Sequence, residues 1–270
     1  MKSAKELALD RVILRHLEKG TKAYELGQLL TQDEEIQSLQ EYANIVAIKR
    51  LGYNDHGPVH MRQVAVNALV MLRLLHDAGI KTSMETEEEG DYDDSTCAVL
   101  LAGFLHDMGM TVSRADHELT GLVIARPIME RLLLQVIPDD LARRTRILSV
   151  ATEGIFGHMA TRAIHSVEAG LILVADGCDM QKGRARIPLM LGPEGTGEVG
   201  DIHKYSSNAI EGVQISKGEN HPIKIEIIMS SDVGYFQVEE VLLQKIAKSP
   251  DKRYLEVYAT VQGGERKRYL

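Results

Sequence analysis

Up to about residue 180 the chain places an apolar residue at every third or fourth position, the spacing that aligns side chains on one face of an α-helix. This pattern predicts helices over residues 4–19, 33–51, 58–77, 95–108, 117–135, 139–154 and 165–180. Gly20, Gly52 and Gly79 follow three of these segments, where glycine commonly ends a helix. Pro58 stands in a first turn, where its missing N–H costs nothing. We therefore expect a helical body.

Beyond residue 200 the spacing of apolar positions changes to two, as in strands that bury one face. PIKIEIIMS (222–230) and YLEVYATVQ (254–262) alternate in this way, and NAIEGVQIS (208–216) is a candidate third strand. The intervening GYFQVEEVLLQKIAKS returns to helical spacing. A small α+β region is therefore predicted at the C-terminal end.

Two segments have compositions typical of loops. Proline and glycine cluster in IPLMLGPEGTGEVG (187–200), which predicts a linker or a mobile loop. The acidic run METEEEGDYDD (84–94) predicts a solvated loop. The expected fold class is mostly α, with a helical domain over residues 1–190 and a small α+β domain over residues 200–270.

Composition narrows the functional classes. A net charge of −8, 4% aromatic residues and no Trp disfavour a nucleic-acid groove with stacking platforms. The N-terminal segment lacks the apolar core of a signal peptide, and the longest apolar runs are too short to span a bilayer. Cys97 and Cys178 form no Cys-x-x-Cys pair, which favours a reducing compartment. We expect a cytoplasmic protein with no nucleic-acid or membrane partner.

The helical pattern places several His and Asp residues in the interior. His60 shares a helix face with Val64, Ala68 and Leu75, so its imidazole points to the core. Neutral imidazole together with carboxylate is a natural ligand set for a divalent metal. The alternative for His60 is a buried histidine that bonds to a backbone carbonyl.

Two strongly apolar helices end in polar residues. His106 and Asp107 follow AVLLAGFL, and burying either one unpaired would cost roughly 1–3 kcal/mol or more. A metal ion bound to both removes that cost; alternatively, His106 ends the helix and Asp107 lies in a turn. Asp176 closes LILVA and is the next candidate ligand, with Asp179 as the runner-up.

Helix geometry separates other pairs. His76-Asp77 is a second His-Asp dipeptide, but it lies about 24 Å beyond His60 on the same helix and on the opposite side, so we expect it at the surface or helix end. His165 lies about 16 Å before Asp176 along one helix, so these two should not share an ion.

The order His60, His106-Asp107, Asp176 resembles the HD superfamily of metal-dependent phosphohydrolases. The resemblance covers roughly residues 40–180. It implies an all-α HD domain with a metal ion at its centre, held by these four residues.

Within that superfamily, DHGPVH is similar to the HN-x-x-H segment of cyclic nucleotide phosphodiesterases, although here the Asn is missing. By this similarity His56 would be the general acid that protonates the leaving group. The alternative is a histidine at the start of a helix that bonds to the backbone.

His117 and His158 extend the resemblance to binuclear members, which include HD-GYP proteins and symmetrical diadenosine tetraphosphate hydrolases. HELTG (117–121) looks like their HxxxG helix start, and the spacing from His158 to Asp176 is similar to that in the tetraphosphate hydrolases. A two-metal site would use Asp107 as the bridge, with both histidines on the second ion. The chain departs from this subgroup at HDMGM, where a Lys is often found, and it lacks a GYP triplet, which argues against cyclic di-GMP chemistry.

A short basic segment follows Asp176, with Lys182, Arg184 and Arg186. It is either a phosphate clamp at the mouth of the pocket or a solvated basic turn.

The resemblance implies an enzyme that hydrolyses a phosphate ester or anhydride of a nucleotide or other small molecule through a metal-activated water, with His56 and Asp107 in catalytic roles. The cofactor would be one or two divalent ions, from among Mn, Fe, Mg, Co, Ni and Zn. One alternative is a nucleotide-binding regulatory HD protein with low turnover, whose C-terminal domain dimerises or senses a ligand. Another is a di-iron oxygenase. The expected partner is a small phosphorylated substrate, and an exposed sheet edge would allow a homodimer.

Overall fold

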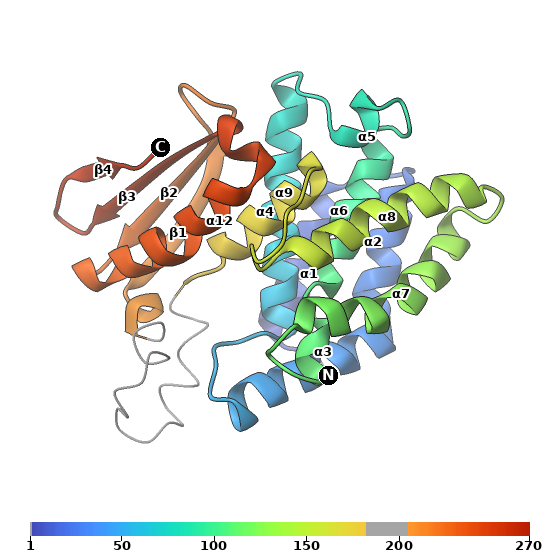
Figure 1. The fold of residues 1–270 in the computed structure, drawn as a ribbon, viewed down its shortest axis with the longest axis horizontal. Helices are drawn as coiled ribbons and strands as arrows, with labels where there is room; N and C mark the ends of the chain where they lie inside the picture. The colour runs from blue at the N-terminus through green and yellow to red at the C-terminus, as the bar shows by residue number, and fades with distance from the viewer. Residues whose placement is uncertain (1, 182–204) are drawn as a thin grey trace.

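A helical body is followed by a small sheet with its own helices in the computed structural model, which describes residues 2–181 and 205–270 (Figure 1). The mostly α fold class with a small α+β C-terminal part is confirmed. The helices of the body are α1 (Ala4–His16), α2 (Lys22–Gln32), α3 (Glu34–Ile45), α4 (Pro58–Asp77), α5 (Ser83–Thr86), α6 (Tyr92–Leu105), α7 (His117–Val136), α8 (Leu141–Gly157) and α9 (Val167–Cys178). A π-helical segment, η1 (Val46–Arg50), extends α3, and a 3-10 turn, η2 (Met108–Thr111), follows α6.

The C-terminal sheet has the order β1-β2-β3-β4. Its strands are β1 (Ile210–Lys217), β2 (Ile223–Met229), β3 (Leu255–Val261) and β4 (Arg266–Arg268). The parallel pair β2–β3 requires a crossover. That crossover contains η3 (Asp232–Gly234), η4 (Gln237–Leu242), α12 (Leu243–Lys248) and η5 (Pro250–Tyr254). Three strands were predicted; β4 was not, because its three residues are basic and exposed.

The prediction of a solvated loop over the acidic run at 84–94 is wrong, because much of this segment is structured. Residues 83–86 form α5, and Met84 is buried. Asp91 caps α6 by accepting a hydrogen bond from the Asp94 N–H at 2.9 Å. The Asp93 carboxylate accepts from the first N–H groups of α2 at 2.8 and 2.9 Å. These acids satisfy helix N-termini instead of facing water alone.

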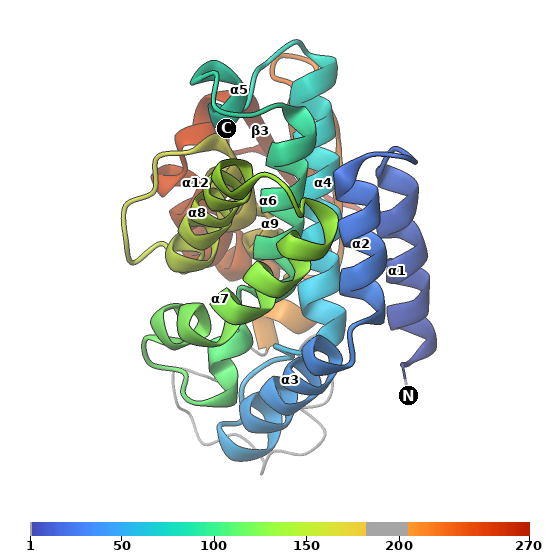
Figure 2. The ribbon, with the colours of Figure 1, turned by 90° about the vertical axis from the view of Figure 1, so that its right-hand side faces the viewer.

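Helix α4 is the central element, packed against α1, α6 and α9 (Figure 2). Its Arg62 is fully buried and pairs with Asp10 of α1 at 2.7 Å, which compensates the buried charge. The same guanidinium donates to Gln40 of α3 at 2.6 Å, and the Gln40 amide donates to the Phe104 carbonyl at 2.9 Å. This network fixes α3, α4 and the last turn of α6 relative to one another.

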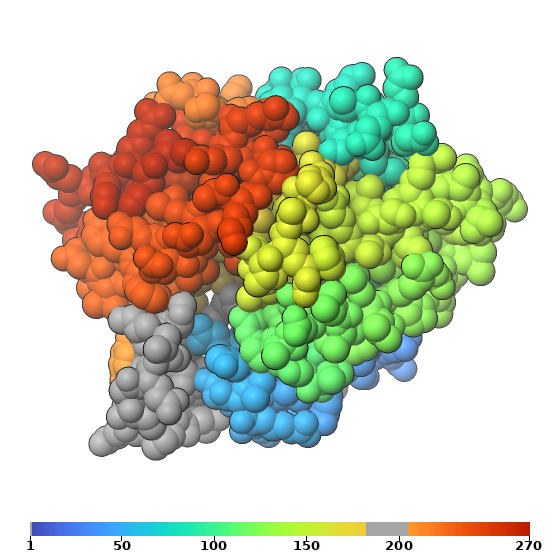
Figure 3. Space-filling model, viewed as in Figure 1, coloured from blue at the N-terminus to red at the C-terminus, as the bar shows by residue number. Residues whose placement is uncertain are grey.

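The C-terminal helices lie directly on the body. Helix α9 packs against α4, α6 and α8 on the body and also against α12 (Figure 1). The space-filling view shows the C-terminal residues in contact with the region of α8 and α9 (Figure 3). The segment 187–200, with the predicted domain boundary, lies outside the described residues. Within the described residues, no helix combines the length and the apolarity that crossing a membrane requires.

Candidate metal centre

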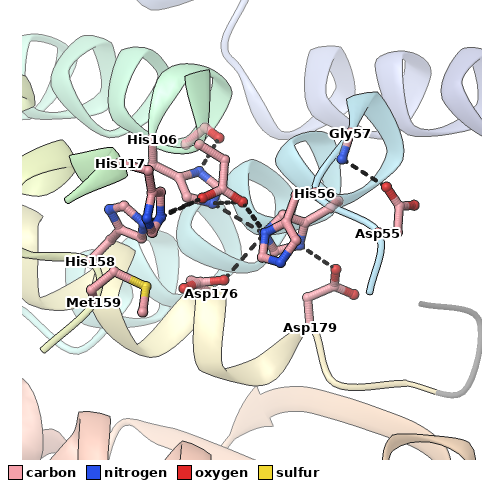
Figure 4. Close-up of polar contacts among 12 residues, drawn as sticks. Asp55, His56, Gly57, His106, His117, His158, Met159, Asp176 and Asp179 are labelled. Carbon is pink, nitrogen blue, oxygen red and sulfur yellow. Dashed lines mark hydrogen bonds and ion pairs between the residues drawn. The ribbon is translucent and has the colours of Figure 1, made fainter. Parts of the chain in front are cut away.

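The six predicted metal ligands come together in the interior of the helical body, and Figure 4 labels four of them, His106, His117, His158 and Asp176. They are His60 in α4, His106 and Asp107 at the end of α6, His117 at the start of α7, His158 at the end of α8, and Asp176 in α9. All are buried except Asp176, whose side chain is 10% exposed. Segments far apart in sequence therefore converge on one cluster.

One half of the cluster surrounds the Oδ2 atom of Asp107. The Nε2 atoms of His60 and His106 are 3.1 Å apart and lie 3.3 and 3.5 Å from this oxygen. The Oδ1 atom of Asp176 lies 3.2 Å from His60 Nε2. Two imidazole nitrogens and two carboxylate oxygens thus face a common point.

The other half surrounds the Oδ1 atom of Asp107. The Nε2 atoms of His117 and His158 are 3.0 Å apart and lie 3.1 and 3.4 Å from this oxygen. The two oxygens of one carboxylate therefore face two different pairs of imidazoles.

The Nδ1 atoms determine which nitrogen of each ring carries the proton. Those of His106, His117 and His158 contact the backbone carbonyls of Gly103, Arg114 and Ile155 at 3.0, 2.9 and 2.7 Å. Since a carbonyl only accepts, each Nδ1 must be the donor. His60 Nδ1 contacts the Asp179 carboxylate at 2.6 Å. All four neutral rings therefore present an Nε2 lone pair to the centre.

The positions of these ring protons show whether the side chains can bind a metal ion. Two lone pairs at 3.0 or 3.1 Å cannot hydrogen-bond to each other, and a 3.4 Å contact from Arg114 Nη1 to His117 Nε2 compensates the second pair only in part. A cation between them satisfies both. Nδ1 held by a carbonyl or a carboxylate is also the usual support of a metal-bound histidine. The clustered His and Asp side chains can thus hold a metal ion.

The electrostatics favour the ionised form of both carboxylates and the neutral form of His158. Burial alone would raise the pKa of Asp107 and of Asp176. The histidines next to Asp107 instead hold its pKa well below the usual range. Lys245 and His60 have the same effect on the pKa of Asp176.

Burial lowers the pKa of His158 to about 4, which keeps this ring neutral. Ionised carboxylates and neutral imidazoles are the forms that bind metals. For His117, burial acts to lower the pKa but the contact with Asp107 raises it overall, so metal binding there would displace a proton.

Comparison with known proteins identifies a similar protein, whose name states no activity. The chain is 38% identical over 233 residues to the uncharacterized protein MJ1020 of Methanocaldococcus jannaschii, and the match covers 86% of this chain and 87% of that protein. The chain belongs to the family of MJ1020. No family model matches it, and no solved structure matches it. The helical bundle with its His/Asp cluster is compatible with an HD domain.

Close backbone contacts bring the ligands together. A Cβ at Gly103 of α6 would lie 2.9 Å from the Ala65 Cα of α4, so the absence of a side chain lets the helices carrying His106 and His60 approach. A Cβ at Gly109 would lie 1.9 Å from the His117 carbonyl. Only glycine at 109 allows the first turn of α7 to lie beside the end of α6.

His56 lies at the edge of the cluster, in the segment before Pro58. Its Nδ1 atom contacts Asp107 Oδ2 at 2.7 Å, and its side chain is 13% exposed. Its backbone N–H donates to Asn44 Oδ1 at 3.3 Å. The ring therefore reaches the centre instead of only bonding to the backbone at the start of α4.

Sequence analysis assigned Asp179 only as a runner-up ligand, and it missed Lys245. Asp179 contacts the far nitrogen of His60 and so orients a predicted ligand. Lys245 of α12 forms an ion pair with Asp176 and donates to the His158 carbonyl at 2.8 Å. A signal existed, because Lys245 lies on the buried face of its helix, beside Leu242 and Ile246.

The remaining candidates lie away from the centre or outside the described residues. His76, in the last turn of α4, is exposed, as predicted, and His165 is also exposed. The basic residues Lys182, Arg184 and Arg186 lie outside the described residues, so their role stays a prediction.

Proposed function

We propose that the chain is an HD-type metal-dependent phosphohydrolase that acts on a phosphate ester or anhydride of a nucleotide or other small molecule. The observation that carries this proposal is the division of the Asp107 carboxylate between the His60–His106 pair and the His117–His158 pair. A carboxylate shared by two sets of ligands is the arrangement expected of a two-metal hydrolytic site.

Each residue of the cluster has a defined task under this proposal. His60, His106, Asp107 and Asp176 would hold one ion, and Asp107, His117 and His158 the other. Divalent ions supply activation of a water molecule and neutralisation of charge on the phosphoryl oxygens. Because the ligands are buried, water would screen the interactions between the ions and the phosphoryl oxygens only weakly.

His56 is assigned the proton transfer. It lines the pocket next to the cluster, is held by Asp107 and lies beside His60, so it is near the reacting group. Its ring nitrogen is also close enough to His60 and Asp107 to contact an ion there, and we assign it the proton instead. An imidazole that protonates the leaving oxygen removes the need to expel an alkoxide. General acid catalysis of this kind commonly contributes about 10²–10⁴-fold to the rate.

The test is turnover of a panel of phosphate compounds with Mn²⁺, together with the metal content of protein purified without chelator. The panel contains nucleoside mono-, di- and triphosphates, cyclic nucleotides, sugar phosphates and p-nitrophenyl phosphate. Phosphate release by the wild type, and loss of both bound metal and turnover in His106→Ala and Asp107→Ala, are expected.

The second His-Asp dipeptide of α4 provides a matched control. His76→Ala and Asp77→Ala change the same residue types at exposed positions, so both should keep full metal content and turnover. Full activity of His106→Ala and Asp107→Ala would contradict the proposal. A metal-loaded wild type that hydrolyses no compound of the panel, measured as released phosphate or, for cyclic nucleotides, as the nucleoside monophosphate formed, would also contradict it and would favour a regulatory role.

A further inference from the structure

A pocket of about 570 Å³ lies between the helical body and the C-terminal helices. Its lining includes His56, Asp107 and Asp176 on the side of the metal centre and Gln244 and Lys245 on the side of α12. The volume is within the range of about 300–1,000 Å³ found for small-molecule sites. The C-terminal region therefore forms one wall of the pocket that gives access to the cluster.

Lys245 is an unexpected residue for that wall. Its side chain is only 10% exposed, and its ammonium group contacts Asp176, a predicted metal ligand. An apolar side chain would dock α12 without the cost of burying a charge. A fixed cation beside a metal site also opposes metal binding by like-charge repulsion. The Asp176 carboxylate and the His158 carbonyl compensate the buried ammonium group, and an anion bound between Lys245 and the metal centre would offset the repulsion.

Arg114 is the matching cation on the other half of the cluster. Its Nη1 atom lies 3.4 Å from His117 Nε2, and its guanidinium lies 5.8 Å from the centroid of the Tyr53 ring. Arg114 also lines the pocket. Within residues 2–181 and 205–270, no carboxylate forms an ion pair with it. One cation therefore accompanies the Asp176 half and one the His117 half.

We propose that Lys245 and Arg114 bind the phosphate group of a small phosphate monoester from opposite halves of the metal centre, which makes the C-terminal region part of the substrate site. This inference rests on the proposed function and deepens it. A monoester dianion offers three non-bridging oxygens to these cations and to the metals, whereas a diester offers two oxygens and a single negative charge. Tyr53, Met159 and Val241 line the same pocket and provide surface for the esterified group.

The first experiment measures inorganic phosphate binding to the Mn²⁺-loaded full chain by titration calorimetry. A charge-assisted hydrogen bond in a buried site is worth about tenfold or more in affinity, so Lys245→Met and Arg114→Gln should each weaken phosphate binding at least ~10-fold. Lys248→Met is the matched control. Lys248 lies one turn later on α12 and donates to the Ala160 carbonyl at 2.7 Å, but it is exposed and does not line the pocket. Its removal should leave phosphate affinity unchanged.

A second readout separates substrate binding from a structural role. In both variants the KM for p-nitrophenyl phosphate should rise at least ~10-fold, while Mn²⁺ affinity does not fall, because each substitution removes a positive charge that opposes metal binding. The wild type should prefer this monoester to bis(p-nitrophenyl) phosphate. If Lys245→Met fails to fold, Arg114→Gln, which changes a loop residue before α7, carries the test.

The outcomes distinguish this inference from the proposed function. Phosphate affinity that is unchanged in both variants, in a protein that hydrolyses phosphate esters, overturns the phosphate-binding pair and leaves the hydrolase standing. A preference for the diester overturns the monoester class. A metal-loaded wild type that neither binds phosphate nor releases it from any ester overturns both.

Discussion

The contact between Asp179 and His60 leads to a quantitative prediction about metal affinity. The Asp179 carboxylate accepts from His60 Nδ1 at 2.6 Å, and Asp179 is only 7% exposed. This contact fixes the ring orientation and the tautomer, and its negative charge makes Nε2 a stronger donor to a metal. Asp179 should therefore strengthen metal binding without touching the metal.

Two substitutions at this position separate charge from geometry. Asp179→Asn keeps an oxygen that can accept from Nδ1 and removes the charge, whereas Asp179→Ala removes both. Loss of such a supporting contact typically costs about 10–100-fold in metal affinity. We expect about tenfold weaker Mn²⁺ binding for Asp179→Asn and a loss closer to 100-fold for Asp179→Ala.

The assay is competition for Mn²⁺ against a fluorescent chelator, with circular dichroism to show that each variant is folded. Asp77→Asn, an exposed carboxylate paired with Arg73 on the same helix as His60, is the control and should bind Mn²⁺ as the wild type does. Unchanged affinity in both Asp179 variants would refute the conclusion that Asp179 supports a metal ligand.

Two further predictions concern stability. Gly103→Ala forces a Cβ to within 2.9 Å of the Ala65 Cα, and we expect a loss of about 1–3 kcal/mol in urea unfolding; unchanged stability would contradict the close packing of α4 and α6. Burial, together with the nearby Glu168 carboxylate, raises the pKa of Asp251 well above 3.8, and neither of its carboxylate oxygens has a hydrogen-bond partner among the described residues. The native chain thus retains a proton that the unfolded chain releases, so stability falls as pH rises from about 4 toward the native pKa, by up to about 1.4 kcal/mol per pH unit. The stability difference between Asp251→Asn and the wild type should grow over that range; a difference that is constant with pH would contradict it.

Four of the six predicted ligands have a local signal in the sequence, whereas His117 and His158 were predicted only from the resemblance to binuclear HD proteins. His106, Asp107 and Asp176 end apolar helices, where unpaired burial is costly, and His60 lies on the buried face of its helix. Helical periodicity also located α4, whose start at Pro58 the structure confirms. A buried polar residue can thus be predicted from sequence when its neighbours along the helix are apolar.

What sequence could not supply depends on contacts between distant segments. Helix α2 was missed although Thr21 caps it locally. What sequence could not show is that the Asp93 carboxylate, about 70 residues away, accepts from the first two N–H groups of this helix. Lys245 lies on an ordinary amphipathic helix, and only the docking of α12 on α9 brings it to Asp176. The tautomers of the histidines likewise depend on which carbonyl each Nδ1 meets.

The central claim is that Asp107 divides its two oxygens between two metal positions. Anomalous diffraction at the manganese absorption edge, from crystals of the Mn²⁺-loaded chain, tests it directly. Two peaks are expected, one between His60 and His106 and one between His117 and His158, with Asp107 between them. Manganese bound elsewhere on the chain, with neither pair of imidazoles in contact with an ion, would contradict it.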